Sequence, residues 1–110
     1  MYTQEQIKNV VNMIVQNVNP SKVILFGSYA NGDPNENSDI DLLIIKNTDT
    51  PLNKRASEVR PYLRGLKIPM DILVYTENEY QQQVNSRYSM ISDIVEKGIV
   101  LYEWEIESYW

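Results

Sequence analysis

Three aspartates are the residues of this sequence best placed to do chemistry. Asp39 and Asp41 lie two apart at the start of an apolar segment, and Asp71 lies near the start of another. Residues two apart in a strand project from the same face, so the first pair predicts neighbouring carboxylates. Two negative charges on one face of a strand are costly in free energy, and Lys22 is the only basic residue of segment 22–45 that could offset them. A shared cation explains the pair, and Asp71 becomes a third ligand if its strand lies alongside.

The absence of two residue types narrows the possible chemistry. The chain contains no histidine and no cysteine, which excludes Ser-His and Cys-His nucleophiles and zinc sites built on imidazole or thiolate. A bound metal must therefore have oxygen ligands, which favours Mg²⁺. Three carboxylates at one end of a sheet predict a two-metal site for phosphoryl transfer. Each aspartate taken alone fits a simple turn or strand start better.

A Gly-Ser pair directly follows the apolar segment 22–26. Gly27 allows backbone N–H groups to approach an anion, and Ser28 adds a hydroxyl donor. Such a pair is usually only a turn. Its distance in sequence from the aspartates is what makes it a predicted phosphate-binding site.

Gly27-Ser28, ten intervening residues and the Asp39-x-Asp41 pair resemble the signature of the DNA polymerase β-like nucleotidyltransferases, with Asp71 in the expected third place. Within that superfamily the chain resembles the minimal nucleotidyltransferases, many of which are the antitoxins of HEPN/MNT toxin–antitoxin pairs. The resemblance implies an α/β fold, a small mixed sheet with packed helices. It also implies that Asp39 and Asp41 bind two Mg²⁺ ions, that Asp71 binds the ion activating the acceptor, and that Gly27 and Ser28 hold the nucleotide phosphates.

The same resemblance implies a reaction and a partner. Family members transfer AMP from ATP to a tyrosine of a partner HEPN RNase toxin and thereby silence it. Two alternatives stay open: transfer to a small molecule such as an aminoglycoside, and a non-catalytic antitoxin that blocks its toxin sterically. The net charge of −5 argues against direct binding of nucleic acid.

The elements that must position these residues follow from apolar periodicity, turn formers and capping boxes at Thr3 and Thr76. Asn31 to Asn37 reads as a surface loop. We expect helices over 4–18 and 52–64, the second kinked at Pro61 and capped by Gly65, and helical structure from Thr76 to Lys97 with a break near Asn85-Ser86. We expect strands over 22–26, 39–45, 70–75 and 99–102.

The 110 residues fit one domain, 1–110, ending in an acidic and aromatic tail over 103–110. The tail's tryptophans could cover the domain's own core or a partner. Five of the ten basic residues lie between 54 and 67, as a solvated helix face or as an anion-facing surface. No signal peptide or membrane-spanning run is evident, so we expect a cytoplasmic protein.

Overall fold

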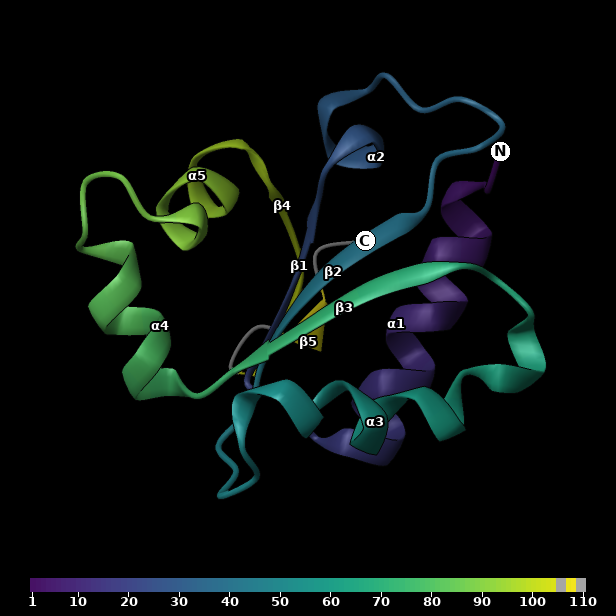
Figure 1. Cartoon of the computed structure of the whole chain (residues 1–110). Helices are drawn as coiled ribbons and strands as arrows, with labels where there is room; N and C mark the ends of the chain where they lie inside the picture. Colours follow the sequence, from purple (N-terminus) through teal and green to yellow (C-terminus); the bar gives the residue numbers. More distant parts are fainter. Residues whose placement is uncertain (105–106, 109–110) are drawn as a thin grey trace.

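The computed structural model describes residues 1–104 and 107–108 and contains a mixed sheet with helices on both faces (Figure 1). The five strands lie in the order β3-β2-β1-β4-β5; β2 and β3 are parallel and the other neighbours are antiparallel. Their bounds are β1 Lys22–Phe26, β2 Ile40–Ile45, β3 Met70–Tyr75, β4 Ile99–Glu103 and β5 Glu107–Ser108. The expected α/β architecture is confirmed.

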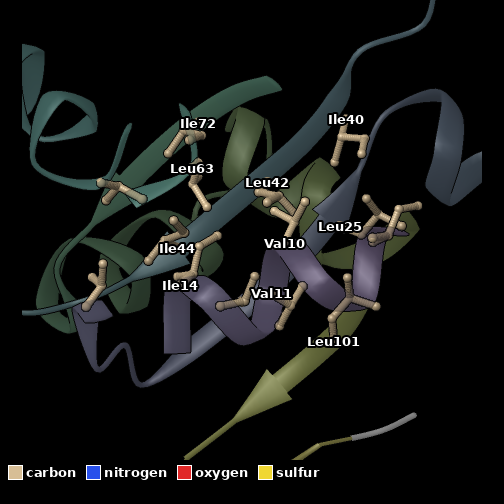
Figure 2. Packing of buried hydrophobic residues seen from close by; sticks show 14 of the residues in the cluster. Val10, Val11, Ile14, Leu25, Ile40, Leu42, Ile44, Leu63, Ile72 and Leu101 are labelled. Atoms are coloured by element: carbon tan, nitrogen blue, oxygen red, sulfur yellow. The ribbon is translucent and has the colours of Figure 1, made fainter. Parts of the chain in front are cut away.

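One face of the sheet packs against α1, Gln4–Val18. This helix begins with the predicted capping box, in which Thr3 accepts a hydrogen bond from the Gln6 N–H and the Gln6 side chain accepts one from Thr3. Val10 and Ile14 of α1 are fully buried in one cluster with Leu42 and other residues of the sheet (Figure 2).

The other face is covered by α4, Glu77–Val84, and α5, Met90–Lys97. Figure 1 shows these two helices on the side of the sheet opposite α1 and α3. Their buried side chains, Tyr80, Ile91 and Ile94, form a second cluster with sheet residues Ile24, Leu43 and Ile45. Strand β2 is therefore buried on both faces, which explains its uninterrupted apolar sequence. The predicted capping box at Thr76 and the break between the two helices are confirmed.

The segment between β2 and β3 differs from the expected single helix over 52–64. It consists of short pieces: η1 Leu52–Lys54, α3 Ala56–Val59, η2 Arg60–Tyr62 and η3 Arg64–Leu66. Pro61 lies at the start of η2, where its missing N–H prevents a continuous helical ladder. The expected cap at Gly65 is also wrong, because the left-handed residue that ends the segment is Lys67, with φ 54°.

The tail begins later than expected, because β4 extends to Glu103 and residues 107–108 pair with it as β5. Trp104 donates its backbone N–H to Ser21 O at 2.9 Å, and its side chain is exposed. The Trp104 side chain therefore does not cover the domain's core, and Trp110 lies outside the described residues. Within the described part of the chain, no helix is both long and apolar enough to cross a membrane.

Candidate functional site

Two of the three predicted aspartates face each other across the parallel strand pair. Asp41 of β2 is in register with Asp71 of β3, and their carboxyl groups interact by a side-chain hydrogen bond. Both project from the face that carries Leu43 and Leu73 two residues further along. The expectation that the strand of Asp71 lies alongside that of Asp41 is confirmed.

This arrangement shifts the acid–base behaviour of Asp41. Burial has the largest effect, and with the hydrogen bond to Asp71 and the negative charges of Asp71 and Asp39 it raises the pKa of Asp41 from 3.8 to about 6. Binding a proton is one way to reduce the repulsion between two facing carboxylates, and binding a divalent cation is another. The donor set, carboxylate oxygens only, suits a hard cation such as Mg²⁺.

Asp39 lies one residue before β2 and is exposed. It is near enough for its charge to contribute to the raised pKa of Asp41. Among the residues that the structure describes, however, no group of three acidic side chains is arranged to hold a metal ion. The structure therefore brings together Asp41 and Asp71, and it leaves Asp39 beside the pair without completing a three-carboxylate group.

Gly27 packs directly against Asp41. Its backbone has φ 74°, a conformation that residues with a Cβ rarely adopt. A Cβ at this position would overlap Oδ2 of Asp41 and lie 3.0 Å from its Cγ. Glycine is therefore required here both for its conformation and for the room that Asp41 occupies. The sequence suggested a different reason, the approach of an anion to the backbone, which these contacts do not test.

Ser28 begins the short helix α2, Ser28–Asn31, immediately after Gly27. Gly27 offers no side chain to cap this helix, and its carbonyl accepts hydrogen bonds from the N–H groups of Ala30 and Asn31. Strand β1 runs antiparallel to β2, so the C-terminal end of β1 and the N-terminal ends of β2 and β3 lie at the same end of the sheet. Figure 1 shows α2 at this end, so the predicted phosphate-binding turn lies beside the aspartates.

Comparison with known proteins agrees with this geometry. Residues 5–102 match the family model of the nucleotidyltransferase domain. The chain belongs to this nucleotidyltransferase family. A candidate protein adenylyltransferase of Methanocaldococcus jannaschii is 32% identical over 104 residues, which is 93% of this chain and all of that protein.

Solved structures show the same fold. A candidate nucleotidyltransferase from Sulfolobus solfataricus superposes with a TM-score of 0.66 at 23% identity, over 94% of this chain and 83% of that one. A toxin–antitoxin structure with AMP-PNP gives a TM-score of 0.62 at 19% identity, covering 90% and 75% of the two chains. The MntA-HpeT toxin–antitoxin gives 0.59 at 18% identity, covering 96% and 76%.

Arg55, one of the five basic residues between 54 and 67 of this nucleotidyltransferase, has a structural role that the sequence did not reveal. Arg55 is only 7% exposed and forms a two-pronged ion pair with Glu79, at 2.6 and 3.1 Å. It also donates hydrogen bonds to Thr50 O at 2.7 Å and Val74 O at 3.2 Å. Arg55 is thus neither a solvated nor an anion-facing residue, and both interpretations of it are wrong.

Arg60 has a related position, since it donates to Met70 O at 3.2 Å. Met70 and Val74 lie four residues apart on the edge strand β3, so their backbone carbonyls point to the same side of the strand. Two arginines therefore hydrogen-bond to backbone carbonyls of the edge strand that carries Asp71, which satisfies part of its unpaired edge. Nothing in the spacing of the basic residues indicated this arrangement.

Tyr29 is another residue that sequence reasoning missed. It follows Ser28 on α2, and its hydroxyl accepts a hydrogen bond of 2.9 Å from the N–H of Tyr2. The two rings lie with centroids 6.2 Å apart. This contact ties α2 to the chain ahead of α1 and so steadies the turn at Gly27.

Proposed function

We propose that this nucleotidyltransferase transfers AMP from ATP to a tyrosine hydroxyl of a partner HEPN RNase toxin, and so acts as its antitoxin. The observation that carries the proposal is the pairing of Asp41 with Asp71, with Gly27, the residue before α2, packed against Asp41. The likeness to a candidate protein adenylyltransferase supports a protein acceptor. The shared fold with toxin–antitoxin structures, one of them with AMP-PNP, is consistent with the partner and the nucleotide.

Each residue of the site has a role in this proposal. Asp39 and Asp41 would hold two Mg²⁺ ions, and Asp71 would hold the one on the acceptor side. When bound, such ions neutralise phosphate charge and lower the pKa of a coordinated hydroxyl. Gly27 and Ser28 hold the outer phosphates through backbone N–H groups and the serine hydroxyl.

The transfer is a single displacement at the α-phosphorus. The tyrosine oxygen forms a bond to that phosphorus, the bond to the bridging oxygen breaks, and pyrophosphate leaves. The phenolic proton passes to the carboxylate of Asp71, which is exposed on the edge strand β3. An edge position lets a folded protein bring its side chain to the carboxylate, so a macromolecular acceptor fits better than one that needs an enclosing pocket.

The test is to incubate the chain with labelled ATP, Mg²⁺ and a HEPN partner, and to locate the product by mass spectrometry. We expect AMP on a tyrosine of the partner, with no product after chelation of the metal or in the Asp41→Asn variant. A partner that is fully neutralised by Asp41→Asn without any adduct would refute the proposal and favour steric inhibition. An adduct on a small molecule but not on the partner would refute the protein acceptor.

A further inference from the structure

A surface pocket of about 360 Å³ lies beside the strand that carries Asp71. Three basic residues line it, and the other lining residues are apolar. The basic residues are Arg60, Arg64 and Lys67, and the apolar ones are Leu63, Ile68, Pro69, Met70 and Ile72. No acidic residue is among them, although the chain as a whole carries a net charge of −5.

The cations of this pocket differ in how far they are already engaged. Arg60 donates a hydrogen bond to Met70 O, which holds it against β3. Among the described residues, neither Arg64 nor Lys67 has a side-chain hydrogen bond or an ion-pair partner, and both residues are exposed. Two positive charges are therefore available to a ligand at the rim of an apolar depression.

The pocket is adjacent to the proposed acceptor side of the active site. Met70 and Ile72, which line it, are the immediate neighbours of Asp71 on β3. Asp71 projects from the opposite face of this strand, so its charge is not directed into the pocket. A polypeptide that crosses the start of β3, the outermost strand of the sheet in Figure 1, can contact the pocket and Asp71 together.

The chemistry of the lining selects the kind of ligand. A free phosphate would be attracted to the cations but would leave most of the apolar lining exposed to water. Nucleic acid would meet the unfavourable field of an acidic protein. A peptide segment with an apolar side chain flanked by aspartates or glutamates matches both parts of the pocket, because it fills the depression and pairs with its rim.

We propose that this pocket, defined by Arg60, Arg64 and Lys67 around an apolar floor, docks an acidic segment of the acceptor protein. The proposal rests on the proposed function for the identity of that protein. It adds that the acceptor is recognised by carboxylates at a site separate from the metal and phosphate residues. Docking there holds the acceptor hydroxyl near Asp71.

A pair of matched variants of this chain tests the pocket. The pocket variant combines Arg64→Glu with Lys67→Asn, because asparagine tolerates the left-handed backbone of Lys67. The control variant combines Arg87→Glu with Lys54→Asn, which changes the net charge equally at exposed positions outside the pocket. Arg60 is left unchanged because it hydrogen-bonds to β3.

Binding is measured first, without any transfer reaction, by fluorescence anisotropy. The probe is a fluorescein-labelled peptide of alternating leucine and glutamate, compared with the same peptide carrying glutamine in place of glutamate. We expect the pocket variant to lose at least tenfold in affinity for the acidic probe, and the control variant to lose less than threefold. Equal losses in both variants, or equal binding of the two peptides by the unaltered chain, would overturn the proposal.

Transfer kinetics on the acceptor protein form the second measurement. The pocket variant should raise KM for the acceptor at least tenfold and leave KM for ATP unchanged, whereas the control variant changes neither. A fall in kcat with an unchanged acceptor KM would contradict docking. If the double variant does not fold, Arg64→Gln alone should give a smaller loss in the same direction. If the unaltered chain modifies no protein, the proposed function fails, and the anisotropy measurement still decides whether the pocket binds acidic peptides.

Discussion

Replacing Asp41 by asparagine should abolish AMP transfer and yet stabilise the metal-free protein at neutral pH. The folded-state pKa of Asp41, about 6, lies above its ordinary value of 3.8. The proton that Asp41 binds therefore stabilises the fold fully below pH 3.8, and this contribution is lost as the pH rises through 6. At pH 7 the ionised carboxylate opposes folding, and asparagine removes that cost while keeping the shape of the side chain.

The size of the effect follows from the shift. The interval between 3.8 and about 6 corresponds to at most about 3 kcal/mol. Asp41 is only partly buried, and screening by solvent reduces this figure to about 1 kcal/mol. With a urea m-value of about 1.5 kcal/mol/M for a chain of this size, the midpoint of unfolding should rise by roughly 0.7 M.

The assay is urea unfolding followed by circular dichroism in the presence of a chelator at pH 4, 5, 6 and 7. The advantage of Asp41→Asn over the unaltered chain should grow from pH 4 to pH 7. Asp49→Asn, at an exposed aspartate outside the site, serves as the control and should have no such trend. A loss of more than about 1 kcal/mol at pH 7 in Asp41→Asn would show that this carboxylate is needed by the fold, and our interpretation of the site would be wrong.

Two further predictions concern residues on either side of the site. Gly27→Val should abolish nucleotide binding and destabilise the fold, because the valine Cβ would overlap Asp41 and the backbone at residue 27 has φ 74°. Unchanged affinity for ATP and Mg²⁺ by calorimetry would contradict this prediction. Arg55→Leu should cost about 1–3 kcal/mol in the free energy of unfolding, because it removes the ion-pair partner of Glu79 and the side-chain donors to the carbonyls of Thr50 and Val74. The hydrogen bond from Arg55 lowers the pKa of Glu79, so the pair stabilises the fold above pH 4.5, and that contribution is lost as the pH falls. An unfolding free energy of Arg55→Leu within about 0.5 kcal/mol of the unaltered chain would refute the role of Arg55.

The sequence predicted the pairing of Asp41 with Asp71 better than it predicted the segment between their two strands. Asp41 is at a fixed distance from Gly27 in the sequence, and β2 is so apolar that its position as an interior strand of the sheet, between β3 and β1, follows directly. The pairing of Asp41 with Asp71 followed from the same strand periodicity once β3 was placed beside β2. The position of each aspartate within its strand depends on local pattern, which a sequence carries, whereas the pairing of the two strands is tertiary.

The role of Arg55 depends on tertiary structure instead. Its partner Glu79 lies 24 residues away, on a different element, and its burial becomes visible only when β3 and α4 are in place. The division of 52–66 into short turns arises in the same way. Pro61 indicated an interruption, but the burial of Val59 and Leu63 in the core cluster with sheet residues is a tertiary feature that local pattern does not specify.

The mixed direction of the strands also determines how the site can come apart. Strands β1 and β2 form an antiparallel pair joined by residues 27–39, whereas β3 is held to the sheet on one side only, by β2. An edge strand opens at a lower free energy than a central one, so local opening of β3 would carry Asp71 away while Gly27 and Asp41 stay together. Hydrogen exchange should then be faster in residues 70–75 than in residues 40–45. A partner bound along β3 would slow this exchange, and in doing so it would hold closed the carboxylate pair on which its own modification depends.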